Sequence, residues 1–177
     1  MAAARNAPTR VIGIDPGLAA TGYGVIEFRA DKASVVEAGV IRCGRAQPAN
    51  LPKRLRALFD ELRLVIDEFR PETMCLEEVY SHTDYPRTSI LMGHARGVIC
   101  LAAQLAGIPV VSISAKRIKQ SVTGNGNASK MQVQRTVQQY FSLDRVPHPP
   151  DVADALAAAL CFLNSLRARK ARMVNSE

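Results

Sequence analysis

Four carboxylates stand at places where the pattern of the chain breaks. Asp15 ends an apolar run, Glu77 ends another, and Asp151 and Asp154 open a long apolar helix pattern. A spacing of three residues lets a helix present both aspartates on one face. Acids gathered at one point repel one another and have raised pKa values, and a divalent cation removes that penalty. Their residue types and placement therefore suggest a metal centre with oxygen ligands.

Each acid also has a simpler interpretation when it is taken alone. The "DPG" at 15–17 is a good tight turn, and a phosphate-cradling loop is a further alternative. Glu77 suits a surface position or an ion pair, while Asp151 and Asp154 suit the first turn of a helix. Only their joint placement in this order of elements, on a basic chain, favours the metal centre.

The apolar periodicity predicts an α/β fold with a mixed five-stranded sheet and helices on its faces. Short apolar or alternating runs predict strands at 10–15, 21–28, 34–43, 73–79 and 109–113, the first three forming an antiparallel meander. Helical spacing predicts helices at 51–69, 87–107, 115–122, 129–141 and 151–169. If the first and fourth strands are neighbours, Asp15 and Glu77 approach each other, and the last helix can bring its first turn to the same point.

Length and composition indicate one folded unit. The chain has 177 residues and is 47% hydrophobic and 22% charged, which suits a single domain with an ordinary core. We expect a loose tail at 1–9, one domain at 10–169 and a basic tail at 170–177. No signal peptide is visible and no apolar run approaches the ~20 residues needed to cross a bilayer, so a cytoplasmic location is the default expectation. The four cysteines lack the spacing of a zinc site and are expected to be buried thiols.

The positive charge is concentrated in one part of the chain. The formal net charge is +7, and no acidic residue lies between Asp84 and Asp144. The basic side chains of that interval and of the C-terminal tail are Arg87, Arg96, Lys116, Arg117, Lys119, Lys130, Arg135, Arg167, Arg169, Lys170 and Arg172. They predict a phosphate-binding surface, with a merely solvated positive face as the alternative. The polar loop "TGNGNA" at 123–128 could present backbone amides to a phosphate or simply connect two helices.

Five segments resemble the successive motifs of one family. They are "IGIDPGLAATGYGVIE", "MCLEEVY", "LMGHARGV", "KRIKQSVTGNGNASKMQV" and "PPDVADALAAAL", in this order along residues 11–163. The resemblance is to the RuvC family of bacterial Holliday-junction resolvases. It implies a ribonuclease H-like fold, a homodimer, and magnesium-dependent nicking of two opposed strands of a four-way DNA junction. It also implies work beside the RuvA–RuvB branch-migration complex in recombination and repair, in the bacterial cytoplasm.

The same resemblance assigns the catalytic metal ligands. By motif they fall on Asp15, Glu77, Asp151 and Asp154, and the family pattern selects Glu77 over its neighbour Glu78. Two magnesium ions per subunit are expected, with manganese as an alternative. One ion would aid formation of hydroxide from water, and the other would neutralise the departing 3′-oxygen.

Contacts to DNA are expected at five positions. Tyr80 matches a family aromatic that could stack on an unpaired base, although packing at the mouth of the core is the alternative. Lys119 and Lys130 match basic positions that contact DNA in the family, and Arg87 and Lys116 are added from the acid-free interval. A plain solvated lysine remains the alternative at Lys119 and at Lys130.

The helix expected at 87–107 has two candidate roles. By family likeness, the small residues around Gly93, Arg96 and Gly97 make it a dimer seam, and packing on its own sheet is the alternative. We expect the apolar side chains of Met92, Val98, Ile99 and Leu101 in the core.

Three other functions compete with junction resolution. One is another nuclease on the same fold, such as a ribonuclease H. Another is an actin-like ATPase or sugar kinase, because the first motif also looks like their phosphate loop, although the chain is short for a pair of such domains. The last is a junction-binding protein without catalysis, which would be expected to lack one of the four acids.

Overall fold

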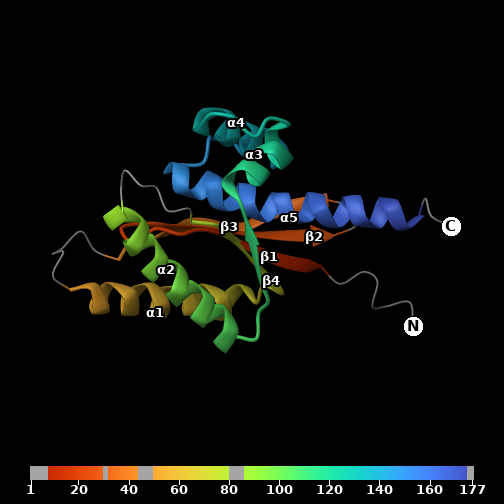
Figure 1. The fold of residues 1–177 in the computed structure, drawn as a ribbon. Helices are drawn as coiled ribbons and strands as arrows, with labels where there is room; N and C mark the ends of the chain where they lie inside the picture. Colours follow the sequence, from red (N-terminus) through yellow and green to blue (C-terminus); the bar gives the residue numbers. More distant parts are fainter. Residues whose placement is uncertain (1–7, 30–31, 44–49, 80–85, 175–177) are drawn as a thin grey trace, which may run out of the picture.

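The structure is a computed structural model that describes residues 8–29, 32–43, 50–79 and 86–174. A central sheet has helices on both of its faces (Figure 1). The strands are β1 (Thr9–Asp15), β2 (Thr21–Arg29), β3 (Lys32–Ile41), β4 (Thr73–Glu77) and β5 (Val110–Ile113). The helices are α1 (Leu51–Phe69), α2 (Pro86–Leu105), α3 (Ala115–Thr123), α4 (Lys130–Tyr140) and α5 (Pro150–Val174).

The sheet is mixed and has five strands in the order β3-β2-β1-β4-β5. Strands β1, β2 and β3 form an antiparallel meander, while β4 lies parallel to β1 and β5 lies parallel to β4. The expected fold class, with its first three strands antiparallel, is therefore confirmed. Because β1 and β4 are parallel neighbours, they end at the same edge of the sheet.

Most element boundaries differ from the predictions by one or two residues, and the end of α5 differs by more. Strand β3 spans 32–41 instead of 34–43, and β4 ends at Glu77 instead of continuing to residue 79. Helix α5 continues to Val174, past the predicted end at Arg169. The extension follows from "ARKARM" at 168–173, which holds only good helix formers and no Gly or Pro to stop the helix.

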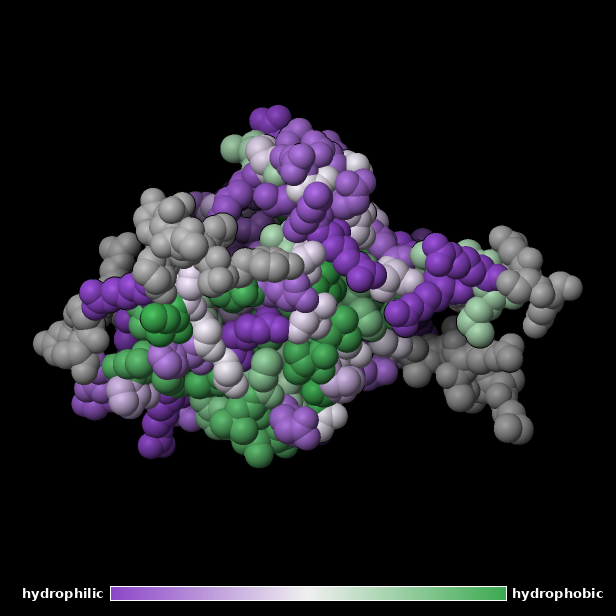
Figure 2. Space-filling view, in the orientation of Figure 1, coloured by the Kyte–Doolittle hydropathy of each residue, from purple (hydrophilic) through white to green (hydrophobic). Residues whose placement is uncertain are grey.

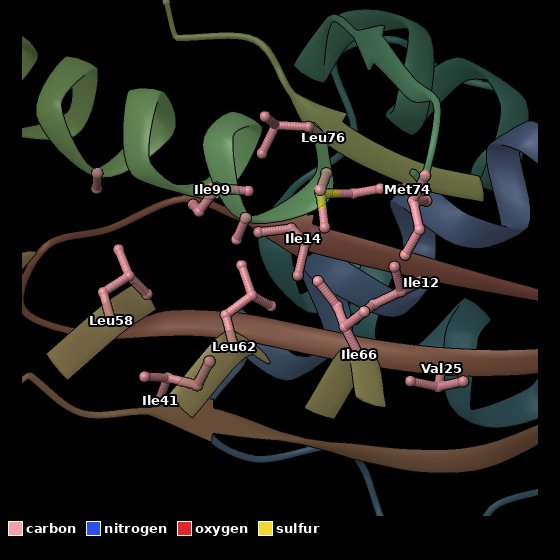
Figure 3. Close-up of a cluster of buried hydrophobic side chains, with 14 of the residues drawn as sticks. Ile12, Ile14, Val25, Ile41, Leu58, Leu62, Ile66, Met74, Leu76 and Ile99 are labelled. Atoms are coloured by element: carbon pink, nitrogen blue, oxygen red, sulfur yellow. The ribbon is translucent and has the colours of Figure 1, made fainter. Parts of the chain in front are cut away.

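Successive side chains of a strand point to opposite faces of the sheet, so the core is divided into two clusters, one on each face. Ile12 and Ile14 of β1 point toward α1 and α2, where they meet the buried side chains of Leu58 and Leu62 (Figure 3). Val11 lies in the other cluster, under α5, α3 and α4. Each face of the sheet is thus covered by helices, as Figure 1 shows.

The expectation that Leu101 belongs to the core is wrong, because this side chain is 52% exposed. Ile99 is fully buried, as expected, and Val98 is half-buried. Helix α2 is rich in small and apolar residues on all sides, so its periodicity did not separate the inner face from the outer face.

Glycines in β1 and β2 let α5 lie unusually close to the sheet. A methyl group added at Gly13 would overlap the carbonyl oxygen of Ala155, and one added at Gly22 would overlap that of Asp151. A strand glycine often marks such a close backbone approach. These two glycines therefore fix the height of the first turns of α5 above the sheet.

The cysteines are free thiols, as expected. Cys43, Cys75 and Cys161 are buried, and Cys100 is half-buried. Within the described ranges, no helix combines the length and the apolar character that a membrane span requires.

Candidate functional site

The register of the sheet brings the first two acids together. Ile14 of β1 pairs with Leu76 of β4, and the next residue along each strand is acidic, Asp15 and Glu77. Because both strands end there, the two acidic residues lie side by side on neighbouring strands at the same edge of the sheet. The convergence expected for these two residues is therefore present in the fold.

Helix α5 brings the other two acids to this edge. Asp15 pairs with Gly22 across β1 and β2, and Gly22 lies directly against the backbone of Asp151. Asp154 follows within the same first turns of the helix. A close helix–sheet contact at one glycine thus sets the position of both helix acids.

A pocket of about 230 Å³ lies where these elements meet. Its lining residues are Asp15, Glu77, Met92, Ala115, Ile118, Lys119, Lys130, Val133 and Asp154. Three of the four predicted acids therefore share one pocket with two of the predicted basic residues. Asp151 is not among the lining residues, but its charge raises the pKa values of both Asp15 and Asp154.

Burial and mutual repulsion make these acids weak. Burial is the main cause that raises the pKa of Asp15 to about 7, and the charges of Glu77, Asp154 and Asp151 add to it. Burial and the charge of Asp154 likewise raise the pKa of Glu77 to about 7. The pKa of Asp154 is raised by burial as well, against the lowering effect of the Lys130 ammonium. Carboxyl groups whose pKa values are shifted in this way are common at functional sites.

Three of the acids line an open pocket and do not surround a single point on all sides. Across residues 8–29, 32–43, 50–79 and 86–174, no three His, Cys, Asp or Glu side chains stand in a ready arrangement for a metal ion. Instead, the Nζ atom of Lys130 lies 3.7 Å from Oδ2 of Asp154. An open arrangement still suits magnesium, which usually takes one or two carboxylates, several waters and the phosphates of a substrate.

The raised pKa values predict how the stability of the protein depends on pH without divalent ions. Acids whose pKa is higher in the folded than in the unfolded state stabilise the fold most below about pH 4. That contribution is lost as the pH rises through about 7, the folded pKa of Asp15 and Glu77. The loss should be of order a few kcal/mol, since one pKa unit corresponds to about 1.4 kcal/mol.

Thermal melts in a chelator test this prediction. Relative to wild type, Asp15→Asn should gain stability as the pH rises from 5 to 8, because the variant lacks one of the acids that must ionise. Addition of 10 mM magnesium chloride should raise the melting temperature of wild type at pH 8 more than at pH 5. A constant difference between the two proteins across this range would contradict the assignment of raised pKa values.

Arg96 supports the site in a way that its sequence did not indicate. Its guanidinium donates hydrogen bonds to the carbonyl oxygen of Glu77 and to Oγ of Ser112. It therefore ties α2 to the ends of β4 and β5. The expectation of a basic surface residue on a dimer seam gave no sign of this inward role, because an arginine in a helix pattern does not reveal which carbonyl it will reach.

The "TGNGNA" loop is not a phosphate cradle. The amide of Gly126 donates to Oε1 of Gln120, and the amide of Asn127 donates to Oδ1 of Asn125. The amides of Asn125 and Ala128 are also used within the loop. The loop is a self-contained connector between α3 and α4, so the alternative of a simple connection holds.

The turn after Asp15 is also stabilised by hydrogen bonds to other parts of the same chain. Oγ1 of Thr21 donates to the carbonyl oxygen of Gly17 at 2.6 Å and accepts from the Gly17 amide at 3.4 Å. Nη2 of Arg54 in α1 donates to the carbonyl oxygen of Leu18 at 3.0 Å. These contacts hold the turn that ends β1 and so help to position the carboxyl group of Asp15.

The five expected DNA contacts have different surroundings. Lys119 is half-buried in the pocket, while Lys130 lines it and is largely exposed. Lys116 is exposed at the start of α3, with its side chain against Gly126, and Arg87 is exposed in the first turn of α2. Neither of these two lines the pocket. Tyr80 lies outside the described residues.

Strand order and site together define a class of protein. A mixed sheet in this order, with acids where parallel β1 and β4 end and a helix that adds more, is the ribonuclease H-like architecture. A solved structure of a yeast mitochondrial Holliday junction resolvase shares this fold, with a TM-score of 0.61 at 15% identity over 88% of this chain and 79% of that one.

Sequence comparison identifies the family within this class. A family model described as "Crossover junction endodeoxyribonuclease RuvC" matches residues 11–162. The chain belongs to the RuvC family of crossover junction endodeoxyribonucleases. A RuvC from Rhodopirellula baltica is 49% identical over 151 residues, 85% of this chain and 84% of that protein. One from Pelotomaculum thermopropionicum is 43% identical over 152 residues, 85% and 90% of the two chains.

A solved structure of a family member agrees with this assignment. The T. thermophilus RuvC in complex with Holliday junction substrate has a TM-score of 0.81 to this chain at 32% identity. The match covers 90% of this chain and 96% of that one. The order of elements that carries the acidic pocket here is therefore shared with a RuvC.

Proposed function

We propose that this protein resolves four-way (Holliday) DNA junctions by hydrolysing two symmetrically placed phosphodiester bonds during recombination and repair. The observation that carries the proposal is the pocket in which acids from β1, β4 and α5 meet under Lys119 and Lys130. Carboxylates suit divalent cations, and the flanking ammonium groups suit the phosphates of a nucleic acid. The family and the names of its members support DNA junctions as the substrate.

Asp15, Glu77 and Asp154 are the proposed metal ligands that line the pocket, and Asp151 is the proposed fourth. These residues suit a divalent cation, since all donors are carboxylate oxygens whose pKa values are raised by burial first and by neighbouring acids second. Two magnesium ions per subunit, or manganese in their place, would supply activation of the attacking water and neutralisation of the leaving 3′-oxygen.

The side chains of the pocket have separate tasks in this proposal. Asp15 and Glu77 are positioned by the paired ends of β1 and β4, and Arg96 also holds the backbone carbonyl of Glu77. Lys119 and Lys130 bind the phosphate of the strand to be cut, and Lys130 leaves its contact with Asp154 to do so. Water attack opposite the 3′-oxygen leaves a 5′-phosphate and a 3′-hydroxyl.

Further DNA contacts are proposed outside the pocket. Lys116 and Arg87 bind backbone phosphates, since both are exposed cations at helix starts. Tyr80, which follows shortly after Glu77 in the chain, stacks on a base near the crossover.

A homodimer would match the two-fold symmetry of the junction and place two pockets on symmetric strands. The candidate interface is the outer face of α2, where Ile90 and Leu101 are 60% and 52% exposed. A methyl group added at Gly93 or Gly97 would meet nothing within 4 Å, so a partner helix can approach closely there. Work beside RuvA–RuvB and a bacterial cytoplasmic location complete the proposal. The single domain starts near residue 10 and includes α5 to Val174, past the predicted boundary at residue 169.

Leu101→Glu should weaken the dimer about a hundredfold or more, because a charge would be buried in its interface. Sedimentation over a concentration series measures this. The variant should also make single nicks where wild type makes paired ones. Val36→Glu places the same charge at an exposed position of the edge strand β3 and should leave the dimer intact. Unchanged sedimentation of Leu101→Glu would exclude this face as the interface.

A substrate panel tests the proposed function. Wild type is incubated with a four-way junction, a linear duplex of the same sequence and an RNA–DNA hybrid, each with magnesium or with a chelator. We expect paired, symmetric nicks with 5′-phosphate ends in the junction with magnesium, and little cutting elsewhere. Preferential cutting of the hybrid would favour a ribonuclease H, and junction binding without any cutting would favour a non-catalytic protein.

A further inference from the structure

Helix α5 extends far beyond the pocket and changes in character as it does so. Its first turns carry the acids, but from Ala155 to Val174 it has no acidic residue. Arg169 and Arg172 are exposed in this distal part. Arg172 follows Asp154 by 18 residues, which is five turns, so both side chains leave the helix in the same direction about 27 Å apart.

Helix α3 lies beside α5 from the pocket to Asn164, part of the way to these arginines. Its Lys119 lines the pocket. Farther along α5, Sγ of Cys161 contacts the carbonyl oxygen of Arg117, and Nδ2 of Asn164 donates to the carbonyl oxygen of Ser121. The exposed cations Lys116 and Arg117 therefore lie alongside the middle of α5. Figure 2 shows hydrophilic side chains over α3 and over the C-terminal part of α5 on this face.

The distal end of α5 is held in place by Arg167. Its Nη1 donates to the hydroxyl of Tyr140 in α4 at 2.6 Å, and its guanidinium lies 5.1 Å from the ring centre of Phe28 in β2. These contacts fix the helix against both α4 and the sheet. The exposed arginines that follow are thus presented from a supported helix.

We propose that Lys116, Arg117, Arg169 and Arg172 form a basic track that binds the phosphate backbone of one duplex arm of the substrate, away from the bond that is cut. The inference rests on the proposed junction substrate and adds where an arm lies on the protein. At about 3.4 Å per nucleotide along a strand, the 27 Å from Asp154 to Arg172 corresponds to about eight base pairs. No acidic side chain of α3, α4 or distal α5 interrupts the track.

The length of the track gives a specific test. Two four-way junctions are compared, one with arms of about 6 base pairs and one with arms of about 15, all closed by hairpin loops so that short arms stay paired. Wild type and Arg169→Gln/Arg172→Gln are titrated with each junction from 50 to 200 mM salt. With long arms, the double variant should bind about tenfold more weakly at 0.1 M salt, and the log–log salt slope should shrink by about 1 to 2. With short arms it should bind like wild type.

Lys53→Gln/Arg56→Gln is the matched control, since it removes two exposed charges from α1 on the opposite face of the sheet. It should bind both junctions like wild type. Equal losses for both arm lengths, equal losses for both double variants, or no loss with long arms would overturn the track while the proposed function stands. Failure of wild type itself to bind either junction would instead refute the proposed function.

Discussion

Asp15→Asn should reduce junction cleavage by at least about a thousandfold, because the metal-bound carboxylates supply several kcal/mol of charge stabilisation in the transition state. Asparagine has nearly the same shape but no charge, and the pKa of Asp15 is raised by burial and then by the charges of the three other acids. Junction affinity should stay within about threefold of wild type, since phosphate binding depends on the lysines and arginines. Single-turnover cleavage and gel-shift titration measure the two effects separately.

Two control variants sharpen this experiment. Asp60→Asn removes an exposed acid from α1 and should cut at the wild-type rate. Glu77→Gln should be as inactive as Asp15→Asn, whereas Glu78→Gln should keep cutting, which tests the choice between the two adjacent acids. Full activity of Asp15→Asn in magnesium would contradict its role as a metal ligand.

Gly22→Ala should lower cleavage by about a hundredfold, although position 22 carries no functional group. The added methyl group would overlap the carbonyl oxygen of Asp151, so the first turn of α5 must move away from β2. A misplacement of about 1 Å at a catalytic group can reduce a rate by about 10². The overlap should also reduce the free energy of unfolding by about 1–3 kcal/mol. Denaturant melts and single-turnover cleavage give the two values.

A positioning effect can be told apart from simple destabilisation. The variant should still bind junctions at a temperature where it is fully folded, yet magnesium should raise its melting temperature less than that of wild type. Ile66→Val shortens a buried side chain of α1 outside the pocket, should cost about 0.5–1.5 kcal/mol, and serves as the control for destabilisation alone. Wild-type cleavage and magnesium response in Gly22→Ala would show that the height of α5 does not matter for the site.

Periodicity predicted the framework of this protein because its elements obey simple rules. Helix α1 has the predicted bounds, 51–69, since its leucines recur at helical spacing and a proline follows. The strands β1 and β4 were found because they are short apolar runs that stop at an acid. The convergence of Asp15 and Glu77 then followed from parallel strands that end at one edge.

The parts of the site that depend on packing between distant segments could not be predicted. The contact of Lys130 with Asp154 requires α4 and α5 to be placed first. The hydrogen bond from Arg96 to the carbonyl oxygen of Glu77 likewise depends on how distant segments pack. The same is true of the bond from the Gly126 amide to the side chain of Gln120. One signal was present but not used: three glycines of "IGIDPGLAATGYG", Gly13, Gly22 and Gly24, lie inside strands, where a glycine indicates a close backbone approach.

The central claim is that the four acids hold the divalent ions used for cleavage. Crystals of the protein with junction DNA, grown with manganese, test it most directly through the anomalous scattering of the metal. We predict two manganese peaks per chain among the carboxylates of Asp15, Glu77, Asp151 and Asp154, close to the phosphate to be cut. A pocket without manganese in crystals of a preparation that cuts junctions in manganese would contradict the claim.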